Sequence, residues 1–428
     1  MVRRRLGLFV ITLLVSPALA RAQEHQHPPA PAQAAPAPEQ REASGTSWLP
    51  DESPMFALHG SQLGGWNTML HGIAFAQYLT DEKPRGSSQF GSINWLMGHA
   101  SRRGAFGELA LRGMVSFDPL TIGGCGYPDL LASGETCDEY AIVDQQHPHD
   151  LIMEIAAMYS RPFGSGLSFQ LYGGPAGEPA LGPTAFPHRV SALMNPLAPV
   201  SHHWIDATHI TYGVVTTGVA ASRWKIEASL FNGREPDENR YDLDFAALDS
   251  YSTRAWFLPT RRWSLQLSAG HLEEAEAAHD ARVDVDRVTA SATYHRALAG
   301  AGIAATTVVW GHNHESGVGT HAFLAESSLV LSDAHVVFAR GELVQKTAHD
   351  LDLHAAVDDV HEIGKLQFGY SRFVALPHGW RLGIGGSLSV GVVSEALAST
   401  YGGRAPLGGG VFLTLRPAAM WMQGATGG

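Results

Sequence analysis

The sequence WRLGIGGSLSVGV, residues 380–392, alternates between two kinds of side chain. The apolar positions are Trp380, Leu382, Ile384, Leu388, Val390 and Val392, with Gly386 among them. The positions between them hold Arg381, Gly383, Gly385, Ser387, Ser389 and Gly391. A period of two predicts a β-strand with one apolar and one polar face. The stretch is longer than the usual strand of about five or six residues. A tilted strand of about nine to eleven residues crosses a bilayer.

The same alternation recurs along most of the chain. The tight turn at 376–379 leads back into a second alternating segment at 361–373, so the two predict a hairpin. From Trp66 onward the pattern predicts sixteen strands. They lie near 66–79, 90–101, 105–117, 151–160, 167–174, 207–221, 223–232, 249–259, 263–271, 285–296, 302–313, 320–331, 334–346, 361–376, 380–393 and 408–416.

Short and long connections alternate between these strands. Every other connection is short, such as 102–104, 260–262, 299–301 and 377–379. The intervening ones are mostly longer: 117–150, 174–206, 233–248, 272–284, 347–360 and 394–407. Short turns on one rim and long loops on the other are typical of bacterial outer-membrane barrels. We therefore predict an all-β, transmembrane, antiparallel up-and-down barrel of about 16 strands, with short periplasmic turns and long outer loops.

The beginning of the chain predicts export. Arg3, Arg4 and Arg5 precede an apolar run at 6–15, and Ala20-Arg21-Ala22 resembles a cleavage site, so residues 1–22 predict a signal peptide. Residues 23–60 are rich in Pro, Ala and Gln and predict a disordered periplasmic tail. The barrel is expected over 61–417, followed by a C-terminal tail at 418–428. An exported protein favours a disulfide between Cys125 and Cys137.

The composition supports a membrane protein and excludes one class of partner. Only 16% of residues are charged, against about 25% in typical soluble proteins. The formal net charge of −12 argues against nucleic acid, which requires a basic surface. A barrel of sixteen strands encloses an aqueous channel in porins, so the polar faces of the strands are expected to line a wet lumen.

The chain resembles Gram-negative outer-membrane porins over about residues 66–416, in architecture and without a specific motif. The resemblance implies localisation in the cell outer membrane, contact with lipid and lipopolysaccharide, insertion by the barrel-assembly machinery, and compatibility with a homo-oligomer. In porins the third outer loop narrows the lumen, and the matching Pro-rich connection here is 174–206. The chain departs from the pattern at its end, where the last strand lacks the usual terminal aromatic residue.

Charged residues of both signs are predicted to line the lumen or its constriction. They are Arg112, Lys225, Arg287, Arg340 and Lys365 with Glu108, Glu227 and Glu342 on the strands, and Glu178, His188 and Arg189 in the constricting loop. A lumen with both signs of charge would select solutes by size and dipole. The expected guests are small polar solutes, with cations and transition metals favoured by the acidic outer rim.

Histidines and acids concentrate near the long-loop rim. The candidate metal ligands are His147, His149, Asp150, His202, His203, Asp206 and His209. Imidazole suits Cu and Zn, whereas the acidic segment at 231–244 could hold Ca²⁺. The sequence therefore leaves three functions open. The first is a porin-like channel, the second a metal-binding barrel without conduction. The third is a rim hydrolase using His149 with Asp150 or His209 with Asp206 as base and orienting acid.

Overall fold

The computed structural model describes residues 41–60, 62, 64–138, 140–164, 166–278, 281–353 and 359–421. All of these belong to one compact unit, 36–428. The predicted signal peptide, residues 23–40 of the predicted tail and residues 422–428 lie outside the described residues. Within the described chain, no helix has the length and apolar character needed to cross a membrane.

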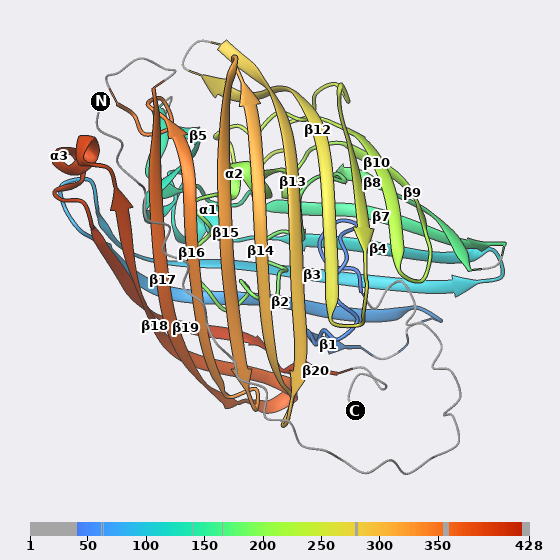
Figure 1. Ribbon diagram of the computed structural model, residues 1–428. Helices are drawn as coiled ribbons and strands as arrows, with labels where there is room; N and C mark the ends of the chain where they lie inside the picture. The colour runs from blue at the N-terminus through green and yellow to red at the C-terminus, as the bar shows by residue number, and fades with distance from the viewer. Residues whose placement is uncertain are drawn as a thin grey trace, which may run out of the picture. The chain divides into compact units, whose positions relative to one another are not determined.

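The described residues form a closed barrel of sixteen antiparallel strands (Figure 1). The barrel strands are β2 (Asn67–Asp81), β3 (Ser88–Gly104), β4 (Gly107–Val115), β7 (Ile152–Phe163), β8 (Leu167–Ala176), β9 (Val214–Ala220), β10 (Trp224–Phe231), β11 (Ser250–Phe257), β12 (Trp263–Ala278), β13 (Ala281–Leu298), β14 (Gly302–Glu315), β15 (Val318–Leu331), β16 (His335–Thr347), β17 (Val360–Ala375), β18 (Trp380–Val393) and β19 (Leu407–Pro417). The sixteen strands predicted from the alternation, and the fold class, are confirmed.

The wall closes where the last strand meets the first. Gly408–Leu415 of β19 pair with Asp81–Ala74 of β2. Next to this pairing of β19 with β2, β1 (Met55–His59) pairs with the beginning of β2, and β20 (Ala419–Met420) pairs with β1. Two short strands that the sequence pattern did not predict thus continue the wall toward the rim of short turns.

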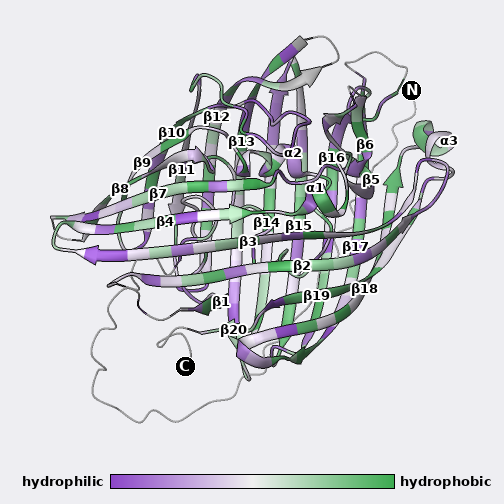
Figure 2. Ribbon diagram, turned by 180° about the vertical axis from the view of Figure 1, so that it is seen from behind, coloured by the Kyte–Doolittle hydropathy of each residue, from purple (hydrophilic) through white to green (hydrophobic). Residues whose placement is uncertain are grey.

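The apolar faces of the strands point away from the lumen. Along β10 every second residue is exposed, and these are Trp224, Ile226, Ala228 and Leu230, while Lys225, Glu227 and Ser229 between them are buried. Leu388 on β18 is 72% exposed. The two kinds of residue alternate along the strands in Figure 2. A soluble barrel would bury the apolar face, so this inside-out arrangement is that of a wall made to contact lipid.

Two predicted boundaries are wrong. The connection predicted at 272–284 is largely strand, because β12 runs to Ala278 and β13 starts at Ala281, with a register shift between Leu272 and Glu276. The alternation did not predict this extension because it requires one apolar face, and polar residues occupy both faces here. The strand predicted from residue 207 begins only at Val214, since Ala207–His209 form a 3₁₀ helix.

Two chain segments lie inside the barrel and fill it. The connection from β8 to β9, residues 177–213, which we call the inner loop, contains α2 (His202–Ile205) and has no exposed residue. The second is the N-terminal segment, residues 41–54, in which Trp48 is fully buried. The prediction of a disordered tail to residue 60 is therefore wrong for 41–60, because backbone oxygens of 43–46 bind basic side chains of the wall.

The connection from β4 to β7 adds a third covered region. It carries α1 (Asp118–Thr121) and the hairpin of β5 (Tyr127–Cys137) and β6 (Tyr140–Gln146), and the predicted disulfide joins Cys125, before β5, to Cys137 at the end of β5. Leu130 and Leu131 of β5 pack with Trp204 of α2 and with wall residues such as Val309. The inner loop is thus held between the wall and this hairpin. Short 3₁₀ or α turns complete the chain at Pro377–Gly379, Glu395–Leu397 and α3 (Ala398–Tyr401).

Candidate functional site

Polar contacts attach the inner loop to several strands of the wall. Asn195 Nδ2 donates to Gln367 Oε1 of β17 at 2.6 Å. The backbone N–H and the hydroxyl of Ser201 both donate to Glu342 Oε1 of β16, at 3.0 and 2.7 Å. Apolar side chains of the loop, such as Val190 and Trp204, also pack into core clusters shared with the wall, so polar and apolar contacts together hold the loop in place.

Arg189 is the central cation of this attachment. Its Nε donates to Glu326 Oε1 of β15 at 2.5 Å, and its Nη1 donates to Asp206 Oδ2 at 2.9 Å. Burial alone would raise the pKa of Asp206, but the Arg189 guanidinium and the His202 ring outweigh burial and hold that pKa well below its usual range. Arg189 therefore links the wall to the inner loop and links two parts of the loop to each other.

The wall residues predicted to line a wet lumen point inward, but they are buried against other chain segments. Arg112 Nη2 lies 3.0 Å from Glu154, and Arg112 also donates to the oxygens of Ala43 and Gly45. Glu227 pairs with Lys225 and with Arg254. Other predicted positions have partners on neighbouring strands, with Arg340 beside Glu326, Arg287 beside Asn313 and Glu108 beside Arg103, whereas Lys365 pairs with Asp129 of β5. The prediction of a wet lumen did not settle whether the pore is open or plugged, since period-two alternation cannot report what occupies the interior.

Two predicted constriction residues of the inner loop have different surroundings. Glu178 lies 3.5 Å from Arg254 and directly against Gly45 of the N-terminal segment, and burial raises the pKa of Glu178 to about 7. His188 packs against Trp95, with ring centroids 4.5 Å apart, and burial lowers its pKa well below the usual value. Both residues contact the inner side of the wall, at Arg254 and Trp95, and their role in a constriction stays a prediction.

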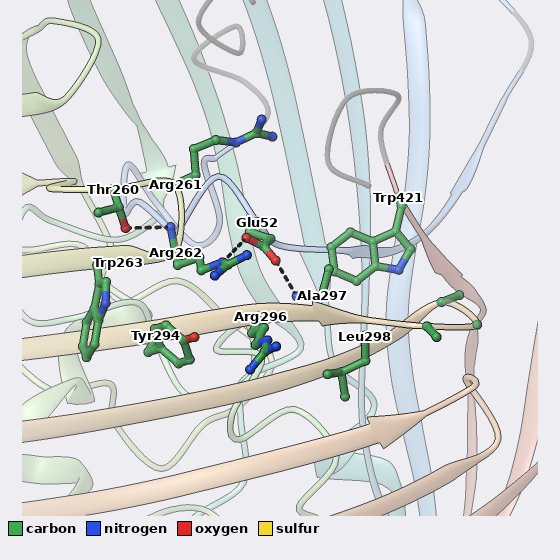
Figure 3. Close-up of a pocket in the computed structure, with 13 residues that line it drawn as sticks. Glu52, Thr260, Arg261, Arg262, Trp263, Tyr294, Arg296, Ala297, Leu298 and Trp421 are labelled. Carbon is green, nitrogen blue, oxygen red and sulfur yellow. Dashed lines mark hydrogen bonds and ion pairs between the residues drawn. The ribbon is translucent and has the colours of Figure 1, made fainter. Parts of the chain in front are cut away.

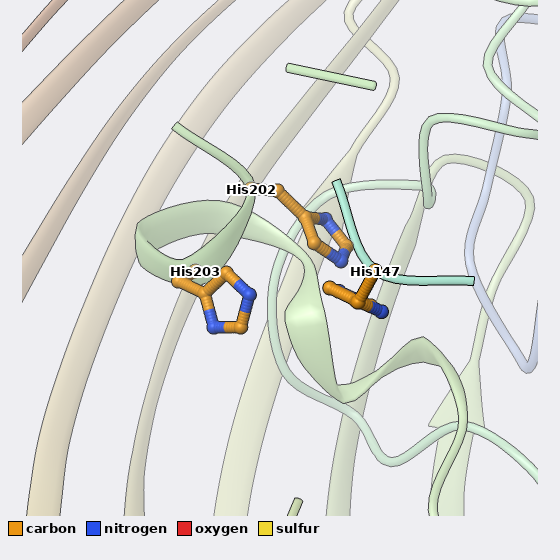
Figure 4. Close-up of side chains that lie close together, drawn as sticks. All are labelled: His147, His202 and His203. Atoms are coloured by element: carbon orange, nitrogen blue, oxygen red, sulfur yellow. The ribbon is translucent and has the colours of Figure 1, made fainter. Parts of the chain in front are cut away.

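Five of the predicted metal ligands gather in one buried group beside α2, which we call the histidine cluster: His147, His149, His202, His203 and His209. Figure 4 shows three of them, with His202 and His203 on α2 and His147 on the segment that leads into β7. One ring nitrogen from each of these three lies within 4.8 Å of the others. The ring centroids of His202 and His209 are 5.1 Å apart, and those of His149 and His209 are 5.4 Å apart.

Each of the three rings in Figure 4 has a carboxylate next to its Nδ1. Asp206 Oδ1 lies 2.8 Å from His202 Nδ1, Glu235 Oε1 lies 2.8 Å from His203 Nδ1, and Glu135 Oε1 lies 3.1 Å from His147 Nδ1. A carboxylate at Nδ1 favours the tautomer that keeps the proton there and leaves the Nε2 lone pair available. Burial lowers the pKa of His202 and of His147, so both rings are neutral at pH 7.

The remaining predicted ligands and the predicted catalytic pairs are placed differently. Asp150 lies outside the cluster, where it accepts from Tyr212 and Arg240. His149 Nδ1 meets Asp118, not Asp150, and His209 Nδ1 meets the backbone oxygen of Asp206, not its carboxylate. The base and orienting-acid pairs expected for a hydrolase are therefore wrong. Sequence reasoning also missed Glu135, Glu235 and Asp118, since each is far in sequence from the histidine that it contacts.

A hollow opens at the rim of short turns. It has a volume of ≈ 930 Å³ and lies between the turns at 260–262 and 299–301 (Figure 3). Glu52 reaches into it from the end of the N-terminal segment, pairs with Arg262 at 2.8 Å and accepts from the backbone N–H of Ala297 at 2.7 Å. This contact fastens the N-terminal segment at the rim where the barrel begins.

The architecture has counterparts among solved structures. The anion-selective porin from Comamonas acidovorans shares 12% identity with this chain, covers 82% of it over 99% of its own length, and superposes with a TM-score of 0.50. OmpF of Salmonella typhi, in a complex with daunomycin, shares 8% identity over 82% of this chain and 98% of its own, with a TM-score of 0.51. No protein-family model matches the chain, and no curated protein is significantly similar to it. The chain has the fold of the outer-membrane porins.

Proposed function

We propose that this protein is an outer-membrane barrel of a Gram-negative bacterium that conducts small polar solutes when its inner loop is displaced. The observation that carries the proposal is the contrast between the two surfaces of the wall. Its outer surface is apolar, as at Leu388 and Leu230, whereas its inner surface carries ion pairs and hydrogen bonds to the inner loop, such as Arg189 with Glu326, beside apolar contacts. The charged and polar side chains of this inner surface can be solvated by water once the loop moves.

The solutes that suit such a channel are small and polar, because both signs of charge face the loop from the wall. Glu326 and Glu342 stand beside Arg340, and Asp129 stands beside Lys365. The transverse field between such groups orders dipoles and slows bulky or apolar molecules. Small cations are included among the expected solutes. Insertion by the barrel-assembly machinery and contact with lipopolysaccharide belong to the same proposal.

Single-channel recording in planar bilayers tests this proposal. We expect the wild type to show rare openings of low amplitude in KCl, because the inner loop fills the lumen. Arg189→Ala, which removes contacts to Glu326 and Asp206, should raise the frequency or size of the openings several-fold. The control is Arg404→Ala, since Arg404 is an exposed residue 3.7 Å from Glu395.

The folded state of each variant is checked by heat-modifiable migration in detergent gels. If neither wild type nor a folded Arg189→Ala variant conducts, the channel proposal fails. A metal-binding barrel without conduction would then be the better assignment, and the histidine cluster is the feature that favours it.

A further inference from the structure

The histidine cluster contains several buried ring nitrogens that lack a partner. Among the described residues, Nε2 of His147, His202, His203 and His209 has no hydrogen-bond partner. All four side chains lie in the covered interior beside α2. A buried polar atom without a partner loses its hydrogen bonds to water and is destabilising, so four such atoms within one cluster need an explanation other than packing.

We infer that His147, His202 and His203 form a binding site for a divalent transition metal, Zn²⁺ or Cu²⁺, with their Nε2 atoms as ligands. This inference goes beyond the proposed channel function and does not require conduction. A single ion would satisfy the three unpartnered nitrogens at once. Three protein ligands leave a fourth position for water or a guest molecule.

The distances fit an ion of this size. Zinc–nitrogen bonds of about 2.0–2.1 Å place tetrahedral ligand atoms roughly 3.4 Å apart. One ring nitrogen of each histidine lies within 4.8 Å of those of the other two, so rotations of the side chains would bring the Nε2 atoms to that spacing. His202 and His203 are adjacent on α2, and the helix is fixed to the wall by the hydrogen bond from Trp204 Nε1 to Thr320 at 2.7 Å.

The carboxylates behind the rings are the second reason for a metal. Histidines that bind metals donate their other ring N–H to a carboxylate or carbonyl, which sets the tautomer and the orientation of the ring. Here three different chain segments place a carboxylate beside Nδ1: Asp206 is hydrogen-bonded to His202, whereas Glu235 and Glu135 lie within ion-pair distance of His203 and His147. A cluster that only filled space would not need one acid behind each ring.

The donor atoms decide the class of metal. Imidazole nitrogen favours Zn²⁺, Cu²⁺ and Ni²⁺, whereas Ca²⁺ and Mg²⁺ prefer oxygen. The two cysteines form a disulfide and supply no thiolate. Ca²⁺ is therefore not expected at this site.

The test is isothermal titration of the refolded full-length protein in detergent with ZnCl₂ and CuSO₄, together with EPR of the Cu²⁺ form. We expect one tight site, with nitrogen hyperfine structure in the EPR spectrum. His202→Ala/His203→Ala should abolish this site. Glu235→Gln keeps all three ligands and should weaken affinity about 10–100-fold.

Two controls separate this site from other histidines. His335→Ala removes an exposed histidine that contacts Tyr370 and should leave binding unchanged. His271→Ala removes a partly exposed histidine from a second group with Glu273 and Asp284.

Tight binding that is lost in His271→Ala and kept in a folded His202→Ala/His203→Ala variant would overturn the inference. Heat without nitrogen hyperfine structure would overturn it as well. Because neither readout depends on conductance, this inference and the channel proposal can fail separately.

Discussion

The wall of the barrel and the chain inside it follow different rules. Along the wall, a strand such as β18 repeats one local pattern, and each residue takes its direction from its neighbours two positions away. The inner loop has no such period. It is positioned by single contacts with distant residues, such as Arg189 with Glu326, 137 positions away. Local patterning is therefore enough to build the wall, whereas the interior depends on specific long-range pairs.

The largest effect that distinguishes the two regions is expected from Arg189→Met. This change leaves Glu326 and Asp206 buried near the lost cation, and breaking a buried pair costs about 3–5 kcal/mol. Urea unfolding of the refolded protein measures the loss. In the double variant with Glu326→Gln the two costs should fall short of their sum, because the residues share a contact. A loss below about 1 kcal/mol would show that polar pairs do not fix the inner loop.

The wall should respond to charge on its outer face. Leu388→Arg puts a cation on an outward position near the middle of β18, and arginine at the bilayer midplane costs about 2–4 kcal/mol. The measurement is unfolding from lipid vesicles, compared with Arg381→Leu near the end of the same strand. An unchanged free energy for Leu388→Arg would mean that this face does not meet acyl chains.

A smaller effect is expected where α2 meets the wall. Trp204→Phe keeps an aromatic ring but removes the hydrogen bond to Thr320, and such a bond contributes about 0.5–1.5 kcal/mol. Trp224→Phe is the matched control, since Trp224 is 39% exposed at the start of β10. Equal losses in both variants would contradict a specific role of the contact between α2 and β15.

A further effect depends on pH. Burial raises the pKa of Glu178 to about 7, above its ordinary value of 4.5. The folded state then binds more protons than the unfolded state between these two values, so this residue lowers stability as pH rises through that window. Glu178→Gln should reduce the fall in stability between pH 5 and pH 8. A steeper fall in the variant would contradict the buried environment of Glu178.

The same contrast explains what the sequence could predict. The sixteen strands, the outward apolar face and the Cys125–Cys137 disulfide follow from local pattern and compartment. The alternation also predicted that Lys225 and Glu227 point inward. It could not predict their burial, because the residues 43–46 that cover them lie far away in sequence. For the histidine cluster, His202, His203 and His147 were found by residue type alone. Their partners Glu235 and Glu135 come together only through the barrel closure and the β5–β6 hairpin.

The central claim is that the inner loop occupies the lumen as an ordered part of the protein. Backbone hydrogen exchange of the refolded protein in lipid nanodiscs tests this claim most directly. We predict that amides of residues 185–206 exchange slowly, with protection approaching that of β15 and β16. Exchange of these amides as fast as that of the exposed turn at 260–262 would show that the lumen is open and would contradict the account.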